Sequence, residues 1–202
     1  MYISNSEIRA KAREALGRNI FSKNYLMLIG MTLVTGIVLS AANYLCCGLG
    51  SLLLCSPLYV GLYKVYLRLV QGDQSITFNS LFDGCNEFGP NLALGVMRTL
   101  IITLWTFLLI VPGIIKSYSY ALSYYIKAEN PDYSWRECLD ESAIMMKGHK
   151  MQLFKLHLSF IGWALLSLLT FGIGLFWVNT YQQTATAIFY EEIKSQTNYE
   201  QN

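Results

Sequence analysis

One uncharged stretch decides the fold: residues 24–63, NYLMLIGMTLVTGIVLSAANYLCCGLGSLLLCSPLYVGLY, contain no Asp, Glu, Lys or Arg. A helix needs about 20 apolar residues to cross a lipid bilayer, so these 40 residues have room for two crossings. The turn CCGLG at residues 46–50 lies between them and is too short and uncharged to be more than a hairpin tip. The stretch predicts a transmembrane hairpin with helices over residues 25–45 and 52–70.

A second hairpin is predicted within the hydrophobic residues 91–126. As one helix this stretch would be about 54 Å long, well beyond the thickness of a bilayer. The only helix breaker inside it is Val111-Pro112-Gly113. We therefore expect one span over residues 92–110 and a shorter, tyrosine-rich segment over residues 114–126. The second segment is short for a full crossing, so whether it crosses the bilayer stays open.

A third hairpin is predicted near the end of the chain. Residues 156–190 form another charge-free run, with Gly172-Ile173-Gly174 in its middle. The expected spans are residues 152–169 and 175–190, followed by a tail over residues 191–202.

The composition agrees with a membrane protein. Of the 202 residues, 53% are apolar and 14% are charged, whereas soluble domains average about 25% charged residues. This excludes a soluble enzyme, a disordered chain and a nucleic-acid-binding domain, and the net charge of +2 is too small to imply a polyanionic partner. We expect an all-α, polytopic membrane protein with six membrane segments in three hairpins.

The first 23 residues predict an amphipathic helix rather than a span. Ser4 and Glu7 stand at capping-box spacing, and apolar residues recur at helical spacing from Ile8 to Ile20. This helix could lie on anionic headgroups or pack as a cytosolic helix on the membrane bundle. Its candidate interfacial basic residues are Arg9, Lys11, Arg13 and Arg18.

A second amphipathic helix is predicted over residues 130–148, beginning near Pro131 and ending before Gly148. Lys147 and Lys150 are its candidate interfacial basic residues. The polar connection over residues 71–90 is expected to be cytosolic and to contain a short amphipathic piece at residues 78–82.

Basic residues predict the orientation. If the three hairpin tips face outward, 14 of the 15 Lys and Arg residues lie on the inner side. Both termini are then cytosolic. No short apolar stretch follows a basic start, so the first hydrophobic run is expected to remain as an anchor.

A threefold repeat is a further hypothesis. Amphipathic or polar preambles end at Gly17, Gly84 and Gly148, and each precedes a hairpin with a glycine-containing tip. The three units would form a pseudo-symmetric bundle.

Residues with obvious chemistry are scarce. None of the predicted spans contains Asp or Glu, and His149 and His157 have no third metal ligand at a suitable spacing. The five cysteines form no metal-binding pattern. We therefore predict no catalytic residue, no metal and no cofactor. A charged cluster of Glu137, Asp140, Glu141 and His149 is better explained as a solvated helix face.

Lys116 is the one basic residue near an outer tip. A lysine at this depth could bind an anionic headgroup, line a polar cavity or extend into an aromatic belt. The candidate lipid or cavity contacts are Lys116, Tyr118, Tyr120, Gln182 and Gln183.

Several motifs resemble an uncharacterised family of bacterial integral membrane proteins. They cover nearly the whole chain: IRAKAR (8–13), PGIIKSYSY (112–120), AENPD (128–132), SAIMMKGHK (142–150), LSFIGW (158–163) and LTFGIG (169–174). One departure is Asn179-Thr180-Tyr181, where the family pattern would have proline before the tyrosine. The resemblance implies the bacterial cytoplasmic membrane and no known catalytic residues. The family is remotely similar to the membrane domain of some glycerophosphodiester phosphodiesterases.

The expected function is that of a non-enzymatic scaffold, accessory subunit or lipid-interacting module. Its expected partners are membrane lipids, with a membrane protein or a second copy of the chain as further options, and no nucleic acid. The alternative is a small transporter or channel-like protein with a polar cavity near Lys116.

Overall fold

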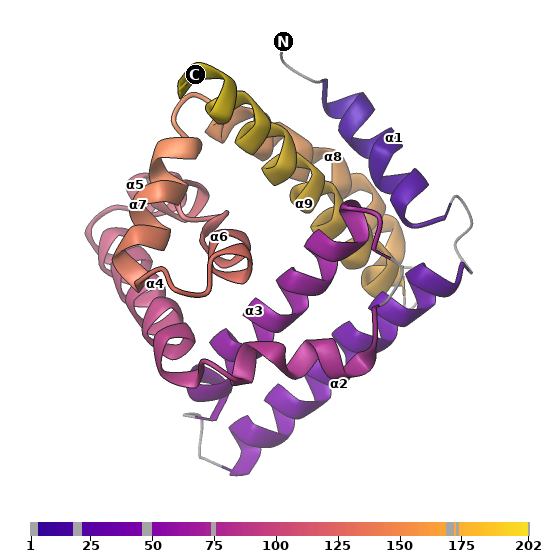
Figure 1. Ribbon diagram of the computed structural model, residues 1–202, viewed down its shortest axis with the longest axis horizontal. Coiled ribbons are helices and arrows are strands. Elements are labelled where there is room, and N and C mark those ends of the chain that lie inside the picture. Colours follow the sequence, from indigo (N-terminus) through magenta and orange to yellow (C-terminus); the bar gives the residue numbers. More distant parts are fainter. Residues whose placement is uncertain are drawn as a thin grey trace. The chain divides into compact units, whose positions relative to one another are not determined.

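The computed structural model describes residues 4–17, 22–45, 50–73, 76–168, 172 and 174–201. All regular secondary structure in these residues is helical, which confirms the all-α prediction (Figure 1). The elements in chain order are α1 (Asn5–Ala15), α2 (Lys23–Leu45), α3 (Gly50–Val70), the 3₁₀ helix η1 (Phe78–Cys85), α4 (Phe88–Leu108), α5 (Ile110–Ser119), α6 (Ser123–Glu129), α7 (Trp135–Met145), α8 (Lys150–Leu168) and α9 (Gly174–Gln201).

The chain divides into two compact units. The first unit comprises Met1–Val34, Tyr66–Ile76 and Met151–Asn202. The second unit comprises Thr35–Val65 and Thr77–Lys150. Each is described separately below.

In the first unit, α8 and α9 form an antiparallel pair. His157 contacts Thr186 through a 3.3 Å hydrogen bond, and the rings of Phe160 and Tyr181 meet edge to face at 5.0 Å. The contact partners move backward along α9 as they move forward along α8, as the predicted third hairpin requires. α9 continues as a helix through the predicted tail to Gln201.

α1 ends earlier than the sequence predicts, since apolar spacing at helical intervals continues to Ile20. Ser4 and Glu7 form the predicted capping box at its start. The helix ends at Ala15, and Gly17 follows with a φ of +94°, a left-handed conformation that favours glycine. Ile8, Ala12 and Leu16 are buried as predicted, while Ile20 lies outside the described residues.

In the second unit, the break between α4 and α5 lies two residues earlier than predicted. Leu109 is extended (φ −159°, ψ 133°), and Pro112 sits in the first turn of α5, where a missing N–H costs no helical hydrogen bond. A Cβ on Gly113 would lie 2.2 Å from Thr106 Oγ1, so the two helices pack closely at this turn. The proline therefore starts α5 instead of ending α4.

The prediction of one segment over residues 114–126 is wrong. α5 ends at Ser119, and α6 begins at Ser123 and is almost entirely buried. The side chain of Ser142 on α7 bridges the break: it accepts a hydrogen bond from the Leu122 N–H (3.2 Å) and donates one to the Ser119 carbonyl (2.8 Å). A distant hydroxyl thus satisfies backbone groups that a continuous helix would have paired.

α7 begins after Ser134 and not at Pro131, which corrects the predicted start of the second amphipathic helix. Ser134 and Glu137 form a capping box like that of α1. Pro131 lies in the turn between α6 and α7.

The predicted threefold repeat holds only in part. α1 and α7 each contain 11 residues, begin with a Ser–Glu capping box and are followed by a glycine with positive φ (Gly17 and Gly148). The corresponding piece before the second hairpin is the 3₁₀ helix η1. The second helices of the hairpins also differ, with 21 residues in α3, 10 in α5 and 28 in α9. The hairpins are therefore not equal copies of one unit.

Two helices among the described residues are long and apolar enough to cross a membrane. They are Lys23–Ala42 of α2 and Phe88–Leu108 of α4, and only 17% of the apolar window in α4 is buried. The topology with six segments stays a prediction.

The α7 capping box predicts a local pH effect. Hydrogen bonds from the Ser134 backbone and hydroxyl lower the pKa of the Glu137 carboxyl below its ordinary value. A lowered pKa in the folded state adds stability above the unfolded-state pKa, near 4.3, and this stability is lost as the pH falls through the lower folded value. We expect amide protection in the first turn of α7 to fall below about pH 4. Glu137→Gln should abolish that pH dependence in hydrogen-exchange measurements, and Glu141→Gln should leave it intact.

Candidate functional site

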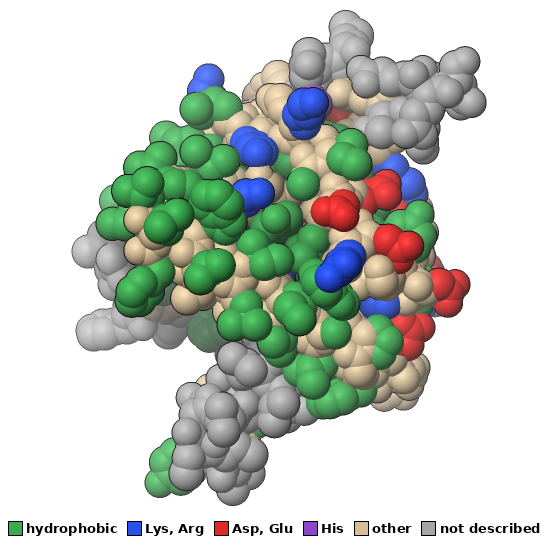
Figure 2. All heavy atoms as spheres, turned by 90° about the vertical axis from the view of Figure 1, so that its left-hand side faces the viewer, with side chains coloured by type: hydrophobic (Ala, Val, Ile, Leu, Met, Phe, Trp, Pro, Cys, Tyr) green, Lys and Arg blue, Asp and Glu red, His purple; other side chains and the backbone are tan. Residues whose placement is uncertain are grey.

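The tip of the second hairpin carries several of the most exposed apolar side chains among the described residues of the second unit. On α4 and α5, Leu104 is 73%, Phe107 93% and Ile110 70% exposed. Figure 2 faces α4, α5 and α7 and shows hydrophobic side chains gathered over a broad area, with Asp and Glu side chains elsewhere on the same face. Water-facing surfaces of monomeric proteins rarely contain apolar patches above a few hundred Å². The tip therefore has the surface of a membrane-embedded or partner-covered segment.

Lys116 lies on α5 beside aromatic rings. Its Nζ is 5.4 Å from the ring centroid of Trp105 and 5.6 Å from that of Tyr120, both within the range of cation–π attraction. Trp105 was not among the predicted contacts, because nothing in the sequence reveals that the α4–α5 turn places it opposite Lys116. The Lys116 ammonium group therefore lies among aromatic rings from α4 and the end of α5.

The five predicted lipid or cavity contacts divide between the two units. Lys116, Tyr118 and Tyr120 belong to the second unit, and Gln182 and Gln183 belong to α9 in the first. Tyr120 is buried, and the other four are partly exposed. None of the five lines the three cavities described below.

An amphipathic cavity of about 630 Å³ lies in the first unit, beside α1 and between α8 and α9. Arg9 and Arg13 line it from α1, and Phe160, Trp163 and Trp177 line it from the hairpin. Sequence reasoning singled out the arginines but missed the aromatic wall. The signal for that wall was the helical spacing of Phe160 and Trp163, which also suits ordinary lipid-facing residues.

Two tyrosine hydroxyls form hydrogen bonds between the helices that line this amphipathic cavity. Tyr181 on α9 donates a 2.9 Å hydrogen bond to the carbonyl of Arg9, which ties α1 to the hairpin. Tyr25 on α2 donates a 2.7 Å hydrogen bond to the carbonyl of Trp177. Arg9 is thus held near the aromatic wall through its backbone carbonyl, a contact that does not use its guanidinium group.

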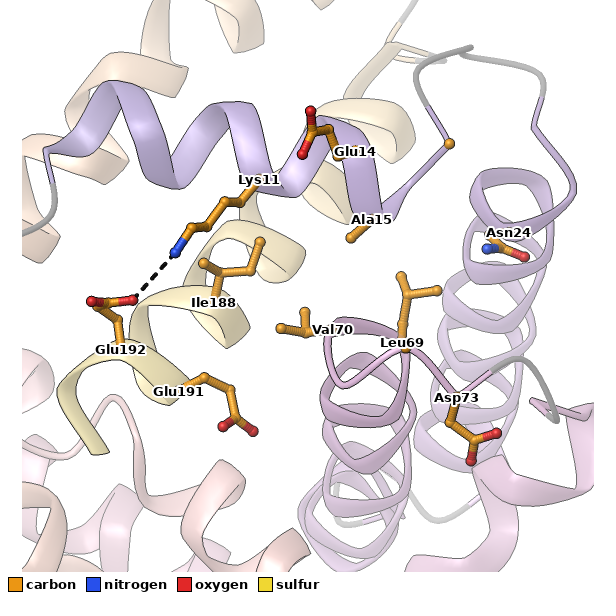
Figure 3. A pocket seen from close by; sticks show the side chains of 12 residues that line it. Lys11, Glu14, Ala15, Asn24, Leu69, Val70, Asp73, Ile188, Glu191 and Glu192 are labelled. Atoms are coloured by element: carbon orange, nitrogen blue, oxygen red, sulfur yellow. Dashed lines mark hydrogen bonds and ion pairs between the residues drawn. The ribbon is translucent and has the colours of Figure 1, made fainter. Parts of the chain in front are cut away.

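The opposite side of α1 borders a polar cavity of about 550 Å³, shown in Figure 3. Lys11 extends toward Glu192 on α9 and forms a 3.4 Å ion pair with it. Glu14, Asp73 and Glu191 are further acidic residues around this cavity. α1 therefore separates a polar, acidic region from an amphipathic one with two arginines.

The remaining predicted basic residues do not join either cavity. Lys147 is exposed and Lys150 partly exposed, at the turn between α7 and α8. Arg18 lies outside the described residues.

Lys127 is a buried charged residue that sequence reasoning did not single out. Its side chain is 1% exposed, and its Nζ donates to the carbonyls of Pro131 and Tyr133 (2.9 Å for the latter) and lies 3.4 Å from a carboxylate oxygen of Glu87. The three ammonium protons thus have three acceptors. Glu87, Lys127 and Tyr133 also line a third cavity of about 470 Å³. The contacts point to a structural role, joining the α6–α7 turn to the start of α4.

Several residues with potential catalytic chemistry lie on α7, and the structure describes their surroundings. No group of three or more His, Cys, Asp or Glu side chains among the described residues could hold a metal ion. Burial raises the pKa of the Cys138 thiol to about 11, which disfavours the reactive thiolate. Glu137, Asp140 and Glu141 are exposed on α7, in keeping with a solvated face. Cys46 and Cys47 lie outside the described residues.

Comparison with known proteins gives a family match for part of the chain. Neither a curated protein nor a solved structure matches it significantly. Residues 107–197, from the tip of the second hairpin into the last helix, match a family described as "Protein of unknown function (DUF975)". Over this region the chain is similar to an uncharacterised family.

Proposed function

We propose that this chain is an integral membrane protein that acts as a non-enzymatic, lipid-interacting module. The observation that carries the proposal is the exposed apolar surface of α4 and α5. Leu100, Leu104 and Phe107 are all exposed on a helix long enough to cross a bilayer. Lipid is the solvent in which such a surface is stable without a further partner.

The full proposal includes six membrane segments with cytosolic termini in a bacterial cytoplasmic membrane. The concentration of basic residues in the segments assigned to the inner side supports this orientation. The position of α1 also supports it. Arg9 and Arg13 on α1 line the cavity with the aromatic residues of the hairpin. Lys11 on the same helix lines the cavity with the acidic residues. The resemblance to the membrane domain of some glycerophosphodiester phosphodiesterases fits lipid-linked work by analogy.

A membrane-insertion assay tests the proposal. Full-length wild-type protein should stay in the membrane pellet after alkaline carbonate extraction. Leu100→Asp combined with Leu104→Asp places two carboxylates on the exposed face of α4. Each aspartate near a helix centre costs about 2.5–3.5 kcal/mol of insertion free energy. Other proposed spans can still anchor the variant, so the readout is the amount of monodisperse protein recovered from the carbonate-resistant pellet, which we expect to fall at least severalfold.

Two comparisons make this assay decisive. The matched control is Leu100→Ala with Leu104→Ala, which shortens the same side chains without adding charge and should remain in the pellet. If wild-type protein is extracted by carbonate, or if the Asp variant inserts as well as the Ala variant, α4 does not face lipid and the proposal fails.

A further inference from the structure

The amphipathic cavity beside α1 combines two features that suit one class of ligand. At one end, Arg9 and Arg13 present guanidinium groups, and no Asp or Glu is among the described residues that line the cavity. From the hairpin, Phe160, Trp163 and Trp177 supply an apolar aromatic surface, with Phe160 beside Tyr181 and the two tryptophans about one helical turn closer to Gly174. We propose that this cavity binds one anionic glycerophospholipid, with its phosphate at the arginines and an acyl chain along the aromatic wall. The inference rests on the proposed membrane location and names the lipid class and the residues that hold it.

The arrangement along α9 sets the orientation of the lipid. Tyr181 lies at the level of Arg9, and the cavity extends from there to Gly174 at the start of α9. These seven residues span on the order of 10 Å along the helix axis. In the proposed topology Gly174 lies toward the outer side of the membrane, so the cavity runs from the α1 side into the bilayer. A phospholipid in this cavity has its headgroup at the arginines and an acyl chain directed along α9 toward Gly174.

The two sides of α1 explain why an anionic headgroup is selected. Lys11 on the polar side already has a carboxylate partner in Glu192. On the cavity side, Arg9 donates from Nε to the Asn5 carbonyl at 3.3 Å, which leaves its terminal nitrogens for a ligand. Arginine forms bidentate, charge-assisted hydrogen bonds with phosphate. The cavity volume of about 630 Å³ is within the usual range for ligand sites, about 300–1,000 Å³.

Native mass spectrometry of the full-length protein in nanodiscs tests the site, with phosphatidylglycerol and phosphatidylcholine as the lipid probes. Wild-type protein should retain one phosphatidylglycerol per chain in preference to phosphatidylcholine. Arg9→Gln with Arg13→Gln should weaken phosphatidylglycerol retention at least about tenfold, because the phosphate loses its charge-assisted hydrogen bonds. Arg9→Lys with Arg13→Lys should restore part of the binding.

Two control variants separate the site from general attraction to the membrane. Lys11→Gln removes one positive charge from the other side of α1, against two in the Arg-to-Gln variant, and should change retention less than twofold. Trp163→Ala should weaken retention of the lipid without changing the preference for phosphatidylglycerol. The site is overturned if the Arg-to-Gln variant binds like wild type, if Lys11→Gln loses as much binding, or if phosphatidylcholine is retained equally well.

Carbonate extraction of the same variants distinguishes the two proposals. A chain that resists extraction yet shows no selective retention contradicts the lipid site and leaves the membrane location intact. A wild-type chain that carbonate extracts contradicts the proposed function itself. Circular dichroism of each variant, unchanged in helix content, establishes that lost binding reflects the side chains and not unfolding.

Discussion

Lys127→Met should lower the free energy of unfolding of the purified protein by about 3 kcal/mol. Removing one member of a buried, hydrogen-bonded charge pair costs about 3–5 kcal/mol, and Glu87 reduces that figure because its side chain is 40% exposed. Methionine fills a similar volume but donates no hydrogen bond. The carbonyls of Pro131 and Tyr133 would lose the ammonium that joins them. Chemical denaturation in detergent, followed by circular dichroism, measures the loss.

Two variants identify which contacts of Lys127 matter. Glu87→Gln removes only the ion pair, and because that carboxylate is partly solvated the cost should stay below about 1 kcal/mol. Lys147→Met makes the same side-chain change at an exposed lysine and should be nearly neutral. Equal stability of Lys127→Met and Lys147→Met would show that the buried ammonium is dispensable.

Gly61→Ala and Gly84→Ala should both be strongly destabilising. The two glycines let α3 and η1 touch backbone to backbone: a Cβ on Gly61 would lie 1.9 Å from the Leu81 carbonyl oxygen, and one on Gly84 would lie 2.0 Å from that of Pro57. Neither obstacle is a flexible side chain, so the elements must separate. Overpacking costs about 1–3 kcal/mol, and a backbone obstacle places these variants at or above the upper end.

Gly162→Ala is the matched control for these substitutions. An added Cβ at Gly162 in α8 meets nothing within 4 Å, and alanine is favoured over glycine in a helix by about 1 kcal/mol. Thermal unfolding in detergent should therefore show lower midpoints for Gly61→Ala and Gly84→Ala and an equal or higher one for Gly162→Ala. A midpoint for Gly84→Ala like that of the control would mean that α3 and η1 do not pack so closely.

The sequence predicted a helix well where the residues that determine it are close neighbours in the chain. The capping box of Ser4 and Glu7 starts α1 as expected, and the apolar spacing identified Ile8 and Ala12 as buried. Predictions failed where a distant residue intervened. The segment over residues 114–126 reads as one apolar helix, yet Ser142 on α7 satisfies the backbone groups exposed by its break.

The amphipathic cavity also combines features that local sequence predicts with contacts that only the fold creates. Arg9 and Arg13 were recognised from the sequence as basic residues on an amphipathic helix. Their position beside Trp163 and Trp177 depends on α1 packing against the last hairpin, more than 140 residues away in the chain. No periodicity within either segment encodes that contact.

The sequence alone determined which stretches are apolar and helical and in which order they follow. Charge-free length and helical spacing are local properties, so neighbouring residues suffice to read them. The sequence also determined the start of α1, since capping depends on residues three positions apart. The tertiary structure decided which charges are buried and which are free. Lys127 and Lys116 look alike in the sequence as single lysines beside tyrosines, but one meets two carbonyls and a carboxylate, and the other meets two aromatic rings. Those partners come from separate turns and helices, and only the folded chain brings them within a few ångströms.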